Sequence, residues 1–341
     1  MKKLLVIALK WGASIAILAF LCVQAYQNDV FGQLADRPKQ WPLLASALGV
    51  YFTALTITVL RWWILVRALG MALTLREALR IGFLAYLFNL APMGIGIVGG
   101  DLLKAFLLAH RQAGRRVDAL AGVVVDRVVG LLVLLMVASV AVFATDLGRS
   151  PDEMLRKLAL AIWIITLCGL VGTVMVLGPD VTGGRWAVLV ERIPYVGKTL
   201  RRAIDALRAY RHHLSALSAA ACMSAAVHIL LAVSVFLLAA GLYQQTPSLA
   251  MHFVMVPTSL ATGVVPINYG PFEVVLNLLY ARIPCSDGAY MVQGQGFVVA
   301  LGYRIVTLLS AAVGLAYYLA GRRDVAEAIH DEVEAEQAGV L

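Results

Sequence analysis

Long apolar stretches alternate with short polar segments along most of the chain of 341 residues. A helix needs about 20 apolar residues to cross the hydrocarbon core of a bilayer. Runs of that length predict six spanning helices, near residues 4–26, 42–65, 117–144, 158–178, 215–241 and 291–320. The pattern therefore predicts an all-α, polytopic membrane protein.

Two further apolar segments, about 81–110 and 249–281, contain residues that interrupt a helix. Backbone groups in lipid need partners within the protein, so irregular backbone at membrane depth has to be packed in protein or line a polar cavity. Each half of these segments is too short to cross alone, which predicts two re-entrant or broken helix pairs. The breaking residues are Pro92, Gly94, Gly96, Gly99 and Gly100 in the first segment, and Pro266, Gly270 and Pro271 in the second. The glycines of the first segment would allow close backbone approach and hinge movement.

The basic residues of the chain lie mostly in alternate connections between the predicted spans. The net charge is +8, 61% of the residues are hydrophobic, and the mean hydropathy is +0.84. This composition leaves little room for a soluble domain, and no basic patch with interleaved aromatic residues points to a nucleic acid. The positive-inside rule is satisfied when both termini are cytoplasmic. We therefore expect a multi-pass protein of a bacterial-type inner (plasma) membrane, with residues 4–26 as an uncleaved first span.

Two segments outside the spans stand out by charge. Residues 185–213 form a basic amphipathic pattern, typical of a helix that lies on the anionic cytoplasmic leaflet. Specific binding of a lipid headgroup is the alternative for this segment. Residues 322–341 form an acidic tail, which we expect to be solvated.

The two broken segments also suggest an internal repeat. Pro92 and Pro266 are 174 residues apart, and Arg127 and Arg304 are 177 apart. The nearly constant offset predicts two halves, about 1–145 and 156–321, within a single membrane domain. Each half would cross the membrane three times, so the second would be inverted relative to the first. Inverted repeats with broken helices near the midplane are an architecture of transporters.

Ionisable residues at membrane depth are costly and normally face a bundle interior or a wet cavity. Guanidinium groups bind phosphate through two parallel hydrogen bonds, and the N-termini of half-helices add N–H groups to such a site. Asp101 has an alternative role as the N-cap of a half-helix, and Pro271 places Glu273 near the N3 position of another. A purely structural buried ion pair is a further alternative. The candidates are Asp101, Asp126, Arg127, Glu273 and Arg304.

An enzymatic function finds little support in the sequence. Residues 94–99 match the spacing G-x-G-x-x-G, but they lack the strand and helix context of a dinucleotide site. The chain has no P-loop and no serine in a nucleophile elbow, and its six histidines and four cysteines lack metal-ligand spacing. We therefore expect no enzymatic activity, no catalytic residue, no cofactor and no metal.

Several short motifs follow one another along the chain: Arg61-Trp62, Phe88-Asn89-Leu90-x-Pro92, Gly99-Gly100-Asp101-x-x-Lys104, Asp126-Arg127 and Pro266 to Gly270-x-x-Glu273. In this order they resemble the flippase-like family named after the transmembrane region of lysylphosphatidylglycerol synthase. The resemblance spans nearly the whole chain and implies a bundle with two re-entrant helix pairs that moves lipids between leaflets. It implies partners among phospholipids, glycolipids, polyisoprenoid lipids and hopanoid-type lipids. With the charged candidates, it implies a headgroup site formed by Asn89, Gly99, Gly100, Asp101, Lys104, Asp126, Arg127, Glu273 and Arg304.

The resemblance is incomplete in two respects. Relatives often carry a richer glycine pair before the acidic residue of the second loop, where this chain has Asn268 and Tyr269 before Gly270. No soluble aminoacyl-transferase domain is expected, so synthesis of lysylphosphatidylglycerol is not expected either. The alternative function is a non-transporting scaffold that binds enzymes of lipid or cell-envelope biosynthesis. A lipid-modifying enzyme is a further alternative, for which the sequence offers no nucleophile or metal group.

Overall fold

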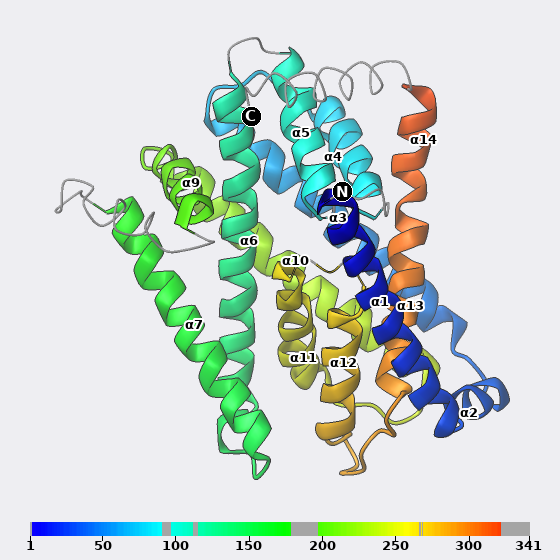
Figure 1. Ribbon diagram of the computed structural model, residues 1–341. Coiled ribbons are helices and arrows are strands. Elements are labelled where there is room, and N and C mark those ends of the chain that lie inside the picture. The colour runs from blue at the N-terminus through cyan, green and yellow to red at the C-terminus, as the bar shows by residue number, and fades with distance from the viewer. Residues whose placement is uncertain are drawn as a thin grey trace.

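The computed structural model describes residues 2–90, 97–111, 115–178, 197–265, 267 and 269–321. These residues form helices and connecting loops, with no strand beyond an isolated bridge between Pro284 and Tyr290. The predicted all-α class is therefore confirmed. In chain order the helices are α1 (Lys2–Gln27), α2 (Val30–Asp36), α3 (Trp41–Ala68), α4 (Leu75–Leu90), α5 (Ile97–Arg111), α6 (Arg116–Ala144), η1 (Leu147–Arg149), α7 (Glu153–Leu177), α9 (Gly197–Arg208), α10 (Leu214–Leu242), α11 (Leu249–Ala261), η2 (Thr262–Val264), α12 (Pro271–Arg282), α13 (Gln295–Ser310) and α14 (Ala312–Ala320) (Figure 1).

The predicted spans correspond to long apolar helices of the structure. Five are long and apolar enough to cross a membrane: α3, α6, α7, α10, and α13 continued by α14. A sixth is formed by α1 and α2, if this pair, bent by 63°, is counted as one span. The chain is thus a multi-pass membrane protein, and all six predicted regions coincide with these helices.

The two interrupted segments form two helix pairs that enter the bundle from opposite ends. The first pair, α4 and α5, lies between the end of α3 and the start of α6, in the upper half of Figure 1. The second pair, α11 and α12, lies between the end of α10 and the start of α13, in the lower half. Both predicted breaks are therefore present. Residues 91–96, which contain Pro92, Gly94 and Gly96, and also Pro266 and Asn268, lie outside the described residues.

The first and second parts of the chain interlock. Helices α3 and α10 pack along each other at the centre, where the Ser234 hydroxyl donates a hydrogen bond of 2.9 Å to the Ala47 carbonyl. Helix α11 packs against α6, and α14 packs against α4. The outer helices also pack on helices from the other part of the chain: α7 packs on α6, and α1 packs on α12 and α13. Each part therefore covers the helix pair or last span of the other.

At one end of the bundle, α7 begins with a helix cap. The Asp152 carboxylate accepts hydrogen bonds from the backbone N–H groups of Met154 and Leu155, at 2.7 and 3.3 Å. It also pairs with Arg282 at the end of α12, at 3.1 Å. Desolvation alone would raise the pKa of Asp152, but these hydrogen bonds and the guanidinium hold it below the usual value.

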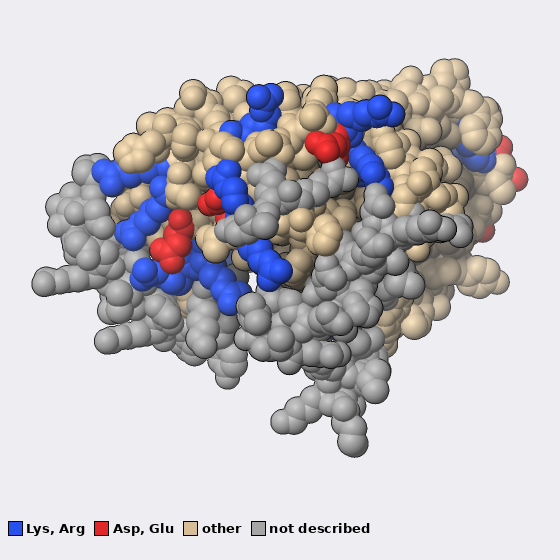
Figure 2. Space-filling model, turned by 90° about the horizontal axis from the view of Figure 1, so that it is seen from above, with Lys and Arg blue, Asp and Glu red and all other residues tan. Residues whose placement is uncertain are grey.

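The opposite end carries many of the basic side chains. Figure 2, the view from above, shows Lys and Arg side chains gathered on this face. Helix α9 contributes the exposed Arg202, while its Ile204 and Leu207 are buried against α6 and α7. Beyond α9, the Tyr210 hydroxyl donates to the Leu65 carbonyl of α3 at 3.0 Å. Part of the apolar side of α9 is thus covered by protein, while Arg202 is exposed. Residues 185–196 of the basic segment and the acidic tail 322–341 lie outside the described residues.

Candidate functional site

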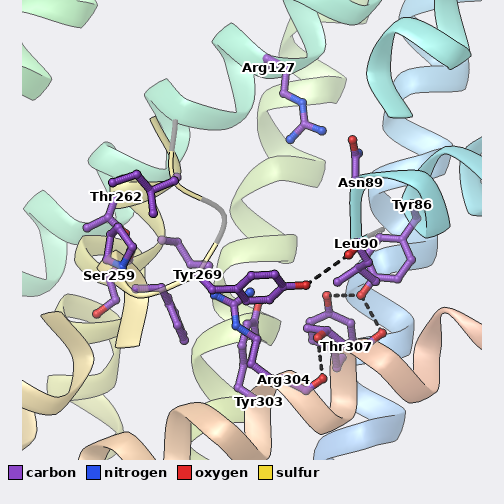
Figure 3. A pocket seen from close by; sticks show the side chains of 16 residues that line it. Tyr86, Asn89, Leu90, Arg127, Ser259, Thr262, Tyr269, Tyr303, Arg304 and Thr307 are labelled. Atoms are coloured by element: carbon purple, nitrogen blue, oxygen red, sulfur yellow. Dashed lines mark hydrogen bonds between the residues drawn. The ribbon is translucent and has the colours of Figure 1, made fainter. Parts of the chain in front are cut away.

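A cavity of about 260 Å³, with charged, hydroxyl and apolar side chains in its lining, lies where the two helix pairs meet. Figure 3 shows residues from both parts of the chain around it. Two arginines supply its charge, and its polar lining is otherwise one amide and a set of hydroxyls. The lining residues are Tyr51, Tyr86, Asn89, Leu90, Arg127, Ser259, Leu260, Thr262, Gly263, Ile267, Tyr269, Pro271, Phe272, Tyr303, Arg304 and Thr307.

On the side of the first helix pair, Arg127 of α6 is held by Asp101 of α5. Its Nε donates to Oδ2 of Asp101 at 2.5 Å, and the Asp101 side chain is only 9% exposed while that of Arg127 is 52% exposed. Asn89, near the end of α4, accepts a hydrogen bond from the Gly100 N–H at 3.0 Å. Asp101 lies within α5 rather than before its first residue, so the alternative role as an N-cap is wrong. The Asn89 side chain, not Asp101, accepts a hydrogen bond from a backbone N–H group in the first turns of α5.

On the side of the second pair, Arg304 of α13 is held by Glu273 of α12. Its Nε donates to Oε1 of Glu273 at 2.6 Å, while Oε2 accepts the Gly270 N–H at 2.8 Å. Glu273 is the third residue of α12, which begins at Pro271, as the sequence predicts, and its carboxylate accepts a hydrogen bond at the helix start. The guanidinium of Arg304 also lies 5.0 Å from the ring centre of Tyr269 and 5.3 Å from that of Phe272.

The two arginines bind their carboxylates in the same way and lie at similar distances from the starts of their helices. Arg127 is eleven residues beyond the start of α6, and at about 1.5 Å per residue it lies roughly 16 Å along that helix. Arg304 is nine residues beyond the start of α13, or roughly 14 Å along it. Each uses Nε for its carboxylate, and no described residue accepts a hydrogen bond from the terminal nitrogens of either. These terminal nitrogens are the donors that a ligand in the cavity would meet.

A second charged group lies beside the cavity without lining it. Asp126 is buried and accepts a hydrogen bond from Arg61 Nε at 2.7 Å, and Arg61 Nη1 donates to the Ser224 hydroxyl at 2.7 Å. The Lys104 ammonium is 3.9 Å from Asp101 and lies over the ring of Trp62 at 5.3 Å. Both Asp126 and Lys104 therefore contact protein groups in this structure rather than the cavity.

The structure thus divides the nine predicted site residues. Asn89, Arg127 and Arg304 line the cavity, and Asp101 and Glu273 lie directly behind the two arginines. Gly99 and Gly100 belong to the first turns of α5, where Gly100 packs so closely on α4 that a Cβ would overlap the Ala85 carbonyl oxygen. Lys104 and Asp126 do not line the cavity.

Sequence reasoning missed the aromatic and hydroxyl lining. The Tyr51 and Tyr86 hydroxyls lie 2.9 Å apart, and Tyr86 donates to the Thr307 carbonyl at 3.0 Å. Tyr269 reaches across the cavity, and its hydroxyl donates to the Leu90 carbonyl at 3.1 Å (Figure 3). A usable signal existed, because Tyr51 and Tyr303 lie inside spans rather than at the membrane interface, where tyrosines normally gather.

The arrangement defines a class of protein: a multi-pass helical membrane protein with a charged cavity between two helix pairs that enter from opposite ends. The family comparison agrees with this class and with the resemblance in the sequence. The model of the family described as "Lysylphosphatidylglycerol synthase TM region" matches residues 5–314, and the chain belongs to this family. Membership supports membrane lipids as partners in general. No curated protein matches the chain.

Proposed function

We propose that the protein moves lipid headgroups between the leaflets of the inner (plasma) membrane through the cavity. The observation that carries this proposal is the pair of guanidinium groups, one from α6 and one from α13, that line a single cavity. A volume of about 260 Å³ suits a headgroup and is too small for a whole lipid. The acyl chains would remain in the bilayer while the headgroup passes between the helix pairs.

The two halves, about 1–145 and 156–321, would act as an inverted repeat in this mechanism. In each, the acidic residue lies near the start of the second helix of a pair and holds an arginine of the following span. Because the pairs enter from opposite ends, the same headgroup site would be opened by movement of one pair for one leaflet and of the other pair for the other leaflet. With the basic face of Figure 2 in the cytoplasm, both termini would be cytoplasmic.

The test is headgroup translocation by purified protein in liposomes, with dye-labelled lipids and an impermeant reductant. Arg127→Ala is expected to lower the rate at least tenfold, since hydrogen bonds to charged groups contribute about 1.5–3 kcal/mol. Asp101→Asn is expected to do the same, because the amide no longer holds the guanidinium as an ion pair. The amount of folded Arg127→Ala protein should stay unchanged, because Lys104 still lies 3.9 Å from Asp101.

Arg149→Ala is the matched control, because the Arg149 side chain is 86% exposed on the loop between α6 and α7. It should translocate lipid as the wild type does. Full activity of Arg127→Ala would refute the site. Protection of labelled lipid equal to that in empty liposomes, with and without a proton gradient, would refute transport and favour the scaffold for biosynthetic enzymes.

A further inference from the structure

The charged residues around the cavity do not balance. Four cations lie in or beside it: Arg61, Lys104, Arg127 and Arg304. Their carboxylate partners are three: Asp101, Asp126 and Glu273. Asp101 is shared, because it pairs with Arg127 and also lies 3.9 Å from Lys104. By formal charges, the described group therefore has one positive charge in excess.

Lys104 is the cation without a carboxylate of its own. Its side chain is 7% exposed, and its stacking over Trp62 suits a charged ammonium. The two buried histidines of the bundle do not alter the balance. Nδ1 of His228 has no hydrogen-bond partner among the described residues, and His252 is satisfied as a neutral ring that donates to Ser248 and accepts from Tyr280.

Uncompensated charge is costly at bilayer depth, so an occupant with one negative charge would be stabilised there. No carboxylate of the described chain lines the cavity, since Asp101 and Glu273 lie behind their arginines. The neighbouring sequence of residues 91–96, 266 and 268 contains no acidic residue either. An ammonium group in the cavity would therefore meet two guanidinium groups and no acidic partner.

The hydroxyl oxygens of the lining could accept hydrogen bonds from neutral hydroxyl groups of a ligand. Ser259 and Thr262 donate their protons to the carbonyls of Met255 and Ser259. Their oxygens are left as acceptors, which hydroxyl groups of a glycerol or a sugar could satisfy. The guanidinium nitrogens would bind the phosphate oxygens.

We propose that the cavity selects headgroups with one net negative charge on a phosphodiester and neutral hydroxyl groups beyond it, and that it discriminates against headgroups with an added amino group. Phosphoglycerol is the simplest example. This inference rests on the proposed function, since it assumes that the cavity is the headgroup site. It predicts that an aminoacylated headgroup is a poorer ligand than the unmodified one.

Binding of short-chain lipids to the purified protein in detergent tests the selection separately from transport. The probes are dioctanoyl phosphatidylglycerol, phosphatidylcholine and lysylphosphatidylglycerol, with net charges of about −1, 0 and +1. Phosphatidylglycerol is expected to bind at least roughly tenfold more tightly than the other two. Equal affinities, tighter binding of lysylphosphatidylglycerol, or no binding of any probe would overturn the inference.

Lys104→Gln tests the charge balance itself, and Lys157→Gln is the control because the Lys157 side chain is 75% exposed on α7. Lys104→Gln should reduce the preference for phosphatidylglycerol over phosphatidylcholine to about twofold, while Lys157→Gln should keep the wild-type preference. An unchanged preference in Lys104→Gln would overturn the argument. If that variant does not fold, the order of the three lipid affinities in the wild-type protein tests the inference alone. Selective binding without any translocation would refute the transport proposal and leave the selection intact.

Discussion

The repeated unit of the site is an arginine whose Nε is bound by a buried carboxylate. Asp101 and Glu273 each accept this hydrogen bond and are far less exposed than their arginines. A carboxylate in this position fixes the plane of the guanidinium and leaves the two terminal nitrogens directed away from it. The acidic residues thus act as positioning residues, while the arginines are the groups that a headgroup would touch.

Asp126 illustrates a different role at the same scale. It is paired with Arg61 between α6 and α3, and both side chains are almost fully buried. Asp126→Asn leaves Arg61 without a charged partner, and the loss of one member of a buried pair costs about 3–5 kcal/mol of the free energy of unfolding. Thermal or denaturant unfolding in detergent measures this loss. Asp146→Asn, in an ion pair with both side chains mostly exposed, should change stability little.

A double variant separates the structural contribution of this pair from a role in binding. Arg61→Met combined with Asp126→Leu removes both charges and is expected to recover most of the lost stability. A stable Asp126→Asn variant that no longer binds phosphatidylglycerol would instead return Asp126 to the headgroup site.

Among the elements, the first helix pair depends on close contact of its two helices. Gly100 of α5 faces the Ala85 carbonyl, and a Cβ there would also lie 2.7 Å from the side-chain amide of Asn89. The second pair is stabilised differently: Pro271 is the first residue of α12, and the Glu273 carboxylate accepts a hydrogen bond from the Gly270 N–H. The two pairs therefore close their contacts with different residues.

Gly100→Ala tests this contact. The added methyl group must displace α5 from α4, and such overpacking costs typically about 1–3 kcal/mol. We expect a lower unfolding temperature and slower translocation, because Asp101 moves with α5. Gly172→Ala on α7 is the matched control, since a Cβ at Gly172 meets nothing within 4 Å. Wild-type stability and transport in Gly100→Ala would contradict the close packing described for this pair.

In the molecule as a whole, helices α1–α6 and α7–α14 interlock, and polar contacts between them lie at the cavity. Tyr269, just before α12, donates a hydrogen bond to the carbonyl of Leu90, the last residue of α4. This contact joins the second helix pair to the first across the cavity (Figure 3). Movement of either pair would break it, so it stabilises the arrangement seen here.

Tyr269→Phe removes this hydrogen bond and keeps the ring over Arg304. A net contribution of about 1 kcal/mol corresponds to roughly a fivefold change in an equilibrium, so translocation is expected to accelerate by up to about that factor. The liposome assay with labelled lipid measures it. Tyr290→Phe, in an exposed loop, should leave the rate unchanged. A slower rate in Tyr269→Phe would show that the hydroxyl serves the headgroup rather than the closed arrangement.

The sequence predicted most of the fold and part of the site. The spans and the two breaks followed from hydropathy, because the bilayer requires about 20 apolar residues per crossing and excludes unpaired backbone. Arg127 and Arg304 followed from ionisable residues in apolar segments, and Asn89 followed from the resemblance to the family. The tyrosine lining and the pairing of Asp126 with Arg61 did not, since both depend on how α3 is rotated against α6 and α13.

By itself the sequence determined which stretches form long apolar helices, the place of the two broken segments, and the presence of charged residues within apolar segments. These are local properties, fixed by the exchange of each stretch of chain between water and lipid. Only the tertiary structure decided which charges share a cavity, which carboxylate holds which arginine, and that one cation is left in excess. These depend on contacts between residues far apart in the chain, such as Asp101 with Arg127 and Tyr269 with Leu90, which no local pattern records.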